Sequence, residues 1–305
     1  MSGQQRVYKQ RIRSTETLKK VFRAMEMIAT SRIGRARARA LQGTPFTLAV
    51  TRAVAAVASH AQLDHPMLNE RTDTNRVAVF VFTSDRGMAG AFAASVLRET
   101  ERTLDELKEA GKDPVLYVLG RRGISYFRFR GRAVVRTWEG HSDSPRHVTA
   151  GEITDEIVRR YLAPHEEDGI GEVYTIGTRF RSMVKQTVEV RRMLPIEVVD
   201  ADEAQDLDGE DHFDPDMYPL YEFEPNADEV LNGLMPLYLR ARMQSVLLHS
   251  AASELAARQQ AMHTATETAE ELITNYTRLA NAARQAEITQ EITEIVSGSD
   301  ALASS

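Results

Sequence analysis

The chain is 305 residues long, with 42% apolar and 27% charged residues. That length predicts about two domains, and the composition excludes general disorder. Cysteine is absent, which excludes disulfide frameworks, thiolate metal sites, catalytic thiols and thiol redox switches. The sequence contains no run of about 18 uncharged apolar residues, the length that a membrane-spanning helix requires, because Arg52 interrupts the best candidate, residues 41–63.

The net charge of −6 hides a strong asymmetry. Residues 1–40 carry eleven Lys and Arg against two Glu, a local charge of +9, so the remainder carries −15. This basic segment has three interpretations: the solvated face of a helix, a nucleic-acid-binding surface, or an Arg-rich transit peptide. Arg35, Arg37 and Arg39 alternate around a helix instead of lining one face, which disfavours nucleic-acid binding.

Residues 1–60 are predicted to form a long helix, because apolar residues recur in steps of three and four. Gly43-Thr44-Pro45 should bend or interrupt the helix before the stripe resumes. The stripe consists of Leu18, Phe22, Met25, Ala29, Ile33, Ala36, Ala40, Val50, Val54 and Val57.

Residues 75–198 are predicted to form a Rossmann-like α/β domain with a largely parallel sheet covered on both faces. Continuous apolar runs alternate with helical stretches, the pattern of buried parallel strands. Alternating apolar and charged residues over 188–194 indicate a half-exposed edge strand. The expected strands are 77–82, 115–119, 133–138, 173–178 and 188–194, and the expected helices are 88–110, a short segment ending near 130, and 151–163.

The turn Thr83–Gly90 follows the first predicted strand and precedes a helix. One interpretation is a phosphate site made by backbone N–H groups at the helix start. The simpler one is a tight turn in which Ser84 or Asp85 caps that helix and Gly87 and Gly90 allow close packing. The turn lacks G-x-G-x-x-G spacing, and the chain lacks a P-loop. The tight turn is therefore favoured.

Residues 199–225 are predicted to be an acidic linker. Between residues 200 and 229 there are thirteen Asp and Glu and no Lys or Arg, which is typical of a solvated, self-repelling loop. Asp206, Asp208 and Asp211 offer a calcium site as an alternative, although the ligand spacing of an EF-hand is missing.

Residues 226–297 are predicted to form a second long helix, followed by a tail, 298–305. Asn226 and Glu229 resemble a capping box, Gly298 should end the helix, and Pro236 should kink or break its first turns. A repeat of 3.5 residues predicts a left-handed supercoil with a partner helix. One series of the repeat is Leu234, Ala241, Leu248, Leu255, Met262, Ala269, Tyr276 and Ala283, and the other is Tyr238, Ser245, Ala252, Gln259, Thr266, Ile273 and Ala280.

The two long helices lie at opposite ends of the chain. The predicted fold class is therefore α/β plus long helices: an antiparallel coiled coil of N- and C-terminal helices with the α/β domain inserted between them. The alternative is two long helices packed separately on a globular core.

The sequence contains no catalytic constellation, and we expect neither a cofactor nor a resident metal. The eight histidines show no metal-ligand pairing, and His249 and His263 are expected on the surface of the long helix. A G-x-S-x-G elbow is also missing.

Three segments together resemble the gamma subunit of F-type ATP synthases. They are Arg11–Ala29 near the N-terminus, Ser84-Asp-Arg-Gly87, and the long run Arg284–Val296; Tyr221–Pro225 also fits the family. Two differences stand out. Met88-Ala89 replaces the family's usual Leu-Cys after the Ser-Asp-Arg-Gly motif, and the acidic run 200–217 is longer than the family requires.

This resemblance implies a non-catalytic rotor subunit that couples rotation of the membrane c-ring to conformational change at the catalytic sites, and so regulates ATPase activity and proton flow. Its implied partners are a ring of three alpha and three beta subunits, the epsilon subunit and the c-ring, with no nucleic acid and no direct membrane insertion. The implied location is the cytoplasmic side of the cell membrane, as a peripheral part of the complex.

The resemblance also implies residue roles. Met25, with Lys20 and Arg23, would meet the lever region of the catalytic subunits. Arg284, Gln285 and Thr289 would contact the catch loops of the ring, and Arg258 would act lower on the shaft; each of these side chains could instead be simply solvated or packed in the seam. The expected seam residues are Phe22, Leu248, Leu255, Met262, Ile273 and Tyr276.

Two rival hypotheses remain open from the sequence. A Rossmann-type enzyme with helical arms would bind a nucleotide through residues 75–198. A coiled-coil scaffold or nucleic-acid adaptor would use residues 1–40, and its binding would fall steeply with salt.

Overall fold

The computed structural model describes residues 3–60, 65–196 and 223–303. Residues 199–222 of the predicted acidic linker, with the candidate calcium donors Asp206, Asp208 and Asp211, lie outside the described residues. The chain divides into two compact units. One contains residues 3–31 and 258–303, and the other contains residues 32–257.

The larger unit is built on a five-stranded sheet in the order β3-β2-β1-β4-β5. β1 pairs in parallel with β2 and β4, and β2 with β3, whereas β5 is an antiparallel edge strand. The predicted parallel sheet and half-exposed edge strand are therefore confirmed. The strands are β1 (Arg76–Phe82), β2 (Asp113–Leu119), β3 (Val134–Trp138), β4 (Glu172–Phe180) and β5 (Gln186–Leu194).

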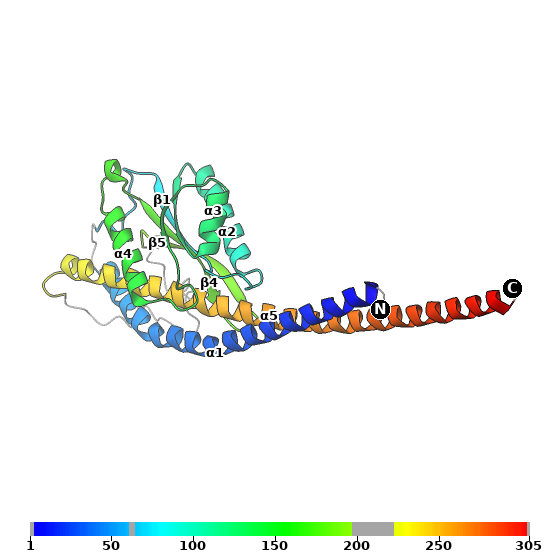
Figure 1. Cartoon of the computed structure of the whole chain (residues 1–305). Coiled ribbons are helices and arrows are strands. Elements are labelled where there is room, and N and C mark those ends of the chain that lie inside the picture. The colour runs from blue at the N-terminus through cyan, green and yellow to red at the C-terminus, as the bar shows by residue number, and fades with distance from the viewer. Residues whose placement is uncertain (1–2, 61–64, 197–222, 304–305) are drawn as a thin grey trace. The chain divides into compact units, whose positions relative to one another are not determined.

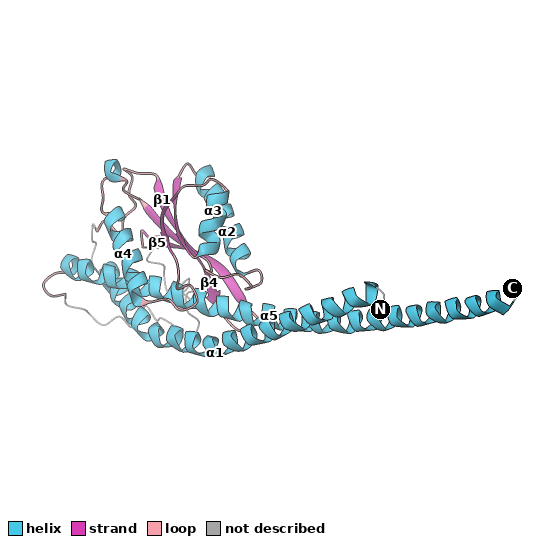
Figure 2. Ribbon diagram, viewed as in Figure 1, coloured by secondary structure: helices cyan, strands magenta, loops and turns pink. Residues whose placement is uncertain are grey.

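The two faces of this sheet carry two separate cores, because alternate side chains of a strand point to opposite faces. Val77, Val79 and Val81 of β1 pack with α2 (Phe92–Glu109) and α3 (Arg121–Phe129). Ala78, Phe80 and Phe82 pack on the other face. That second core contains α4 (His147–Tyr161) and the parts of the two long helices that belong to this unit (Figure 2).

The two long helices are α1 (Gly3–His60) and α5 (Ala227–Ala303), and neither is interrupted. Pro45 lies inside α1, whose ribbon curves through this part but does not break (Figure 1). The expectation that Gly298 ends α5 is wrong, since the helix continues to Ala303; a glycine inside a helix costs only about 1 kcal/mol. Pro236 does not break α5 either. None of the described helices is long and apolar enough to cross a membrane.

The start of α5 carries the predicted N-cap Asn226, but Glu229 pairs with the side chain of Asn226 and not with its backbone N–H, so the capping box is only half formed. The N–H of Glu229 donates to Oδ1 of Asn226 at 2.8 Å, and Nδ2 of Asn226 donates to Oε1 of Glu229 at 3.2 Å. This exchange satisfies a backbone donor that the helix itself cannot pair.

The smaller unit is an antiparallel pair of helices. Tyr8 stacks on Tyr276 with ring centroids 6.4 Å apart, Lys19 pairs with Glu270 at 2.8 Å, and Nδ1 of His263 lies 2.9 Å from Glu26. Residue numbers rise along α1 while their partners' numbers fall along α5, so the two segments run in opposite directions. The predicted antiparallel pairing is confirmed.

Burial along this pair follows the heptad repeat. On α5 the covered positions are Met262, Thr266, Ala269, Ile273, Tyr276, Ala280 and Ala283, alternating in steps of four and three. On α1 the matching positions are Gln5, Tyr8, Ile12, Thr15, Lys19, Phe22, Glu26 and Ala29. Leu18 is an exception to the predicted stripe: it is 51% exposed, and Lys19 takes the seam position. The seam is therefore more polar than the stripe predicts.

Candidate functional site

The first candidate surface is the outward face of α1 in the helix pair. Lys20 and Arg23 are exposed and Met25 is half-buried beside the seam. Leu18, Val21 and Ile28 are each about half exposed, at 51%, 47% and 53%. Their spacing of three and seven residues places them along one side of the helix. This second apolar stripe, next to basic side chains, was not identified from the sequence, although its spacing is a readable signal.

The second candidate surface is the C-terminal part of α5. Arg284, Gln285 and Thr289 are exposed, and the Thr289 hydroxyl donates to the Gln285 carbonyl oxygen at 2.9 Å. Exposed apolar residues recur beside them at steps of three and four: Ile288, Ile292, Ile295 and Val296, between 44% and 71% exposed. Contiguous exposed apolar side chains of this kind are typical of protein-binding surfaces.

Arg258 lies in a different environment from the other predicted contact residues. It is only 5% exposed. The predicted seam residues Leu248, Leu255 and Met262 are likewise buried, at 6%, 2% and 4%, whereas Phe22, Ile273 and Tyr276 are half-buried. Tyr276 also lies under the guanidinium of Arg11, 5.7 Å from the ring centroid, a cation–π contact.

The turn after β1 caps a helix, but not the one expected. α2 begins at Phe92 after Ala91 and has no side-chain cap, so the expectation that Ser84 or Asp85 caps it is wrong. The turn instead caps α3, which follows the next strand. The N–H groups of the first three residues of α3 donate to the turn: Arg121 to Asp85 Oδ1 at 3.2 Å, Arg122 to the Ser84 carbonyl at 3.0 Å, and Gly123 to Thr83 Oγ1 at 3.0 Å.

The carboxylate of Asp85 occupies the N-terminus of α3, so an anion cannot use the N–H groups there. The phosphate site suggested by the sequence would lie at the start of α2 instead, and this capping does not fill that position. The Thr83 side chain packs so closely on α3 that a Cβ on Gly123 would lie 2.7 Å from Thr83 Oγ1. Gly87, in contrast, has open space around it, with only Arg122 at 4.0 Å, so close packing does not account for this glycine.

Asp85 also holds the loop after β3. Its Oδ2 accepts the N–H groups of Gly140 and Ser142, both at 2.9 Å. Burial acts to raise the pKa of Asp85, but the hydrogen bonds from Ser142, Gly140 and Arg121 outweigh it, and the net pKa is lowered. The carboxylate therefore stays ionised and fixes three chain segments to one another.

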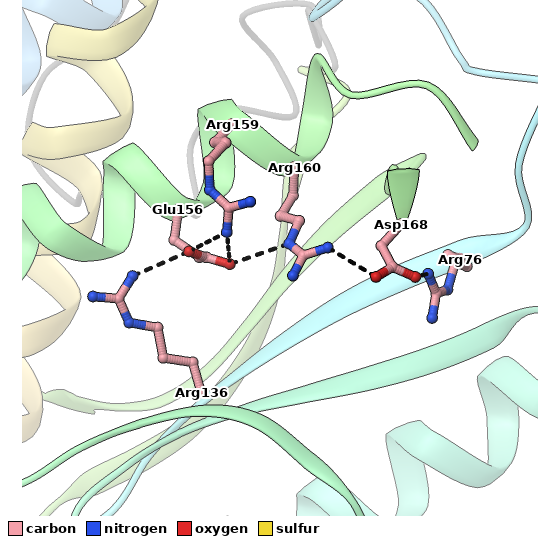
Figure 3. Close-up of polar contacts among 6 residues, drawn as sticks. All are labelled: Arg76, Arg136, Glu156, Arg159, Arg160 and Asp168. Atoms are coloured by element: carbon pink, nitrogen blue, oxygen red, sulfur yellow. Dashed lines mark hydrogen bonds and ion pairs between the residues drawn. The ribbon is translucent and has the colours of Figure 1, made fainter. Parts of the chain in front are cut away.

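A second ionic cluster lies on α4 (Figure 3). Glu156 is 5% exposed and receives Arg136 at 3.0 Å, Arg159 at 2.6 Å and Arg160 at 3.2 Å. Burial would raise the pKa of Glu156, but the hydrogen bonds from the arginines outweigh it and the pKa is lowered. Arg160 continues the chain of charges to Asp168, which also pairs with Arg76. This cluster joins α4 to the sheet edge and has the character of structural ion pairing.

The two histidines predicted on the surface of α5 lie in different environments. His263 is exposed as predicted, but His249 is half-buried and lines a small cavity beside β4 and β5, so its predicted surface position is wrong. Among the described residues, no group of three or more His, Cys, Asp or Glu is placed to hold a metal ion.

Comparison with known proteins agrees with this architecture. Residues 4–302 match the family model described as ATP synthase. The ATP synthase gamma chain of Beutenbergia cavernae is 57% identical over 305 residues and all of both chains. That of Acidothermus cellulolyticus is 51% identical over 302 residues, which are 99% of this chain and 98% of the relative.

Solved structures show the same fold at low sequence identity. A chain of the mitochondrial ATP synthase of Euglena gracilis, in its OSCP/F1/c-ring assembly, superimposes with a TM-score of 0.64 at 14% identity. The match covers 99% of this chain and 95% of that one. A central stalk/c-ring chain from Tetrahymena thermophila gives a TM-score of 0.57 at 21% identity, covering 80% of this chain and 99% of that one. From the full-length identities above, the chain belongs to the gamma-chain family of ATP synthases, whose members are non-catalytic subunits of that complex.

Proposed function

We propose that this chain is the central-stalk rotor that couples rotation of a membrane c-ring to conformational change in the catalytic ring of a proton-translocating F-type ATP synthase. The observation that carries the proposal is the antiparallel helix pair made from the two ends of the chain, which presents different side chains on its different sides. A shaft can shift each catalytic site only by as much as its contacts differ in free energy between states. An asymmetric surface supplies that difference.

The proposed contact residues lie on the two surfaces described above. Lys20, Arg23 and Met25, flanked by the exposed stripe of α1, would meet the acidic lever region of the catalytic subunits. Arg284, Gln285 and Thr289, flanked by the exposed isoleucines, would meet the catch loops of the ring. Arg258 would act from within, by supporting the helix pair, because this side chain is almost fully buried.

The stiffness of the pair fits such a role. A single helix of this length would bend easily, whereas side chains packed as knobs into holes resist twisting. One similar structure comes from a central stalk/c-ring assembly of an ATP synthase. For this chain we propose the c-ring as a partner, together with the partners that the family resemblance implies: three alpha and three beta subunits and the epsilon subunit. The proposed location is the cytoplasmic face of the cell membrane, without insertion of this chain.

Reconstitution of the complex with and without this chain tests the proposal. With the chain, we expect co-purification with the alpha and beta subunits and ATP hydrolysis that pumps protons into inverted vesicles. Without it, coupled pumping should be lost. Full coupled activity in its absence would contradict the proposal. Saturable nucleotide binding through residues 75–198, unchanged by substitution of the α1 arginines, would instead support the Rossmann-type enzyme. Salt-sensitive RNA or DNA binding would support the adaptor.

A further inference from the structure

Three arginines of α1 line one cavity in the larger unit. Arg32, Arg35 and Arg39 stand three and four residues apart, so their side chains share one side of the helix. The cavity has a volume of about 250 Å³. Its remaining lining is Ala36 on α1, Asp143, Ser144 and Pro145 on the loop after β3, and Leu248 and Ala251 on α5.

The positive charge in this cavity exceeds the negative charge. Nη1 of Arg32 pairs with Asp143 at 2.7 Å, and Nη1 of Arg39 donates to the neutral Ser144 hydroxyl at 3.3 Å. Arg35 is exposed and makes no hydrogen bond or ion pair to another residue that the structure describes. Among the lining residues, three guanidinium groups therefore face a single carboxylate.

An anion in this cavity would offset the repulsion among the arginines, because like charges three and four residues apart on a helix repel each other weakly. The buried Ala36, Leu248 and Ala251 form an apolar floor, and a cleft with low-dielectric walls focuses the field of its charges. Guanidinium groups bind phosphoryl oxygens through paired hydrogen bonds.

The loop that forms the opposite wall is held in place. Gly140 and Ser142 donate their N–H groups to Asp85, just before the lining residues Asp143 and Ser144. The wall is thus fixed relative to the sheet before any ligand arrives, which lowers the ordering cost of binding.

We propose that this arginine cavity is a binding site for a small phosphoryl anion, such as free inorganic phosphate or pyrophosphate or the terminal phosphates of a nucleotide. Its volume lies below the range of about 300–1,000 Å³ that is typical for drug-sized ligands, so it would admit the phosphoryl groups and leave the rest of a nucleotide outside. The site does not depend on the rotor function proposed above.

Calorimetric titration of the purified full-length chain with pyrophosphate tests the site. We expect one bound anion per chain and weaker binding at higher ionic strength. Arg35→Gln should weaken binding about tenfold, because it removes charge-assisted hydrogen bonds. Arg37→Gln is the matched control, because this exposed arginine is on the same helix but does not line the cavity. The Arg37→Gln variant should bind pyrophosphate with the same affinity as the wild type.

Asp143→Asn gives an independent signature. It removes the one carboxylate that competes for Arg32, so pyrophosphate should bind more tightly. A parallel titration with ATP distinguishes the two sources: ATP binding that is lost in Arg35→Gln identifies a nucleotide phosphate, and pyrophosphate binding alone identifies a free anion. The proposal is overturned if wild type binds no pyrophosphate, if Arg37→Gln weakens binding as much as Arg35→Gln, or if Asp143→Asn does not tighten it.

Discussion

Asp85 and Ser142 exchange two hydrogen bonds across the carboxyl ends of β1 and β3. The N–H of Asp85 donates to Ser142 Oγ at 2.8 Å, and the N–H of Ser142 donates to Asp85 Oδ2 at 2.9 Å. With its bonds to Arg121 and Gly140, the carboxylate of Asp85 accepts three backbone N–H groups. Through Asp85, the Ser-Asp-Arg-Gly motif therefore links the turn after β1, the N-terminus of α3 and the loop after β3 by hydrogen bonds.

Asp85→Asn should lower the free energy of unfolding by about 2 kcal/mol, because an amide can accept at only one of the two positions that the carboxylate uses. Urea denaturation at pH 7 measures this. Asp105→Asn, on the exposed face of α2, is the control and should change little. Because the pKa of Asp85 is lowered by folding, its stabilisation is complete above its ordinary pKa of about 4 and is lost as pH falls through the folded value. A difference between wild type and variant that grows on acidification would contradict this role.

Glu156→Gln should destabilise the larger unit by about 2 kcal/mol, because three arginines lose the carboxylate that they share. The loss is no larger because these arginines are partly exposed to water, which weakens each ion pair. Thermal unfolding followed by circular dichroism measures this at pH 7. The deficit should shrink as pH falls through the lowered pKa of Glu156, where the wild type loses the same charge. Glu166→Gln, at an exposed position with no ion pair among the described residues, should leave the unfolding temperature unchanged.

Leu255→Pro should abolish assembly, because a proline inside α5 removes a backbone hydrogen bond at a cost of about 3 kcal/mol or more. Leu255 is 2% exposed and lies in a cluster with Ala36 and Ala252. Yield of the reconstituted complex is the readout. Leu255→Met, which conserves volume, should assemble almost normally. Normal yield from the proline variant would argue against a continuous helix.

Met25→Glu should impair coupling more than assembly, because Met25 is half-buried beside the proposed lever contact. We expect fewer protons pumped per ATP hydrolysed in inverted vesicles, with near-normal subunit composition. Met183→Glu offers a control, since this methionine is 40% exposed on the turn between β4 and β5 and not on α1. Equal pumping efficiency in both variants would remove Met25 from the coupling surface.

The antiparallel register can be tested by cross-linking, and the absence of cysteine gives a clean background. A Glu26→Cys, His263→Cys pair should be joined by a short bifunctional thiol-reactive reagent, because the native side chains reach each other at 2.9 Å. The mismatched pair Glu26→Cys, Tyr276→Cys should not, since Tyr276 packs on Tyr8. Non-reducing electrophoresis separates the outcomes, and cross-linking of both pairs alike would show that the register is wrong.

Periodicity predicted most of the fold. Continuous apolar runs predicted the buried strands, and alternating apolar and charged residues predicted the edge position of Gln186–Leu194. An apolar repeat of 3.5 residues predicted the pairing of the two long helices. The helix ends were less predictable. The sequence predicts that Gly298 ends α5, but the helix continues to Ala303. A single glycine costs a helix little, so it does not by itself fix where the helix ends.

The candidate site was harder to predict because its contacts link distant parts of the chain. Asp85 precedes α2 in the sequence, yet it caps α3, which becomes its neighbour only through the parallel pairing of β1 with β2. Likewise, Arg32 joins Arg35 and Arg39 in one cavity only because the loop containing Asp143 covers that side of α1. Local spacing identified the charged segment but not which of its arginines face a common space.

Because the two ends of the chain pair with each other, the helix pair can form only after almost the whole chain has been synthesised. Tyr8 leaves the ribosome early, but its stacking partner Tyr276 is synthesised only near the end of translation. The strands of the α/β domain are complete by Leu194. One face of their sheet, however, packs on α5 residues such as Leu231 and Leu239, so this core also waits for the C-terminal helix. Contacts of such high sequence separation form slowly. A chaperone that shields the early N-terminal segment would therefore raise the yield of the subunit more than one acting on the finished chain.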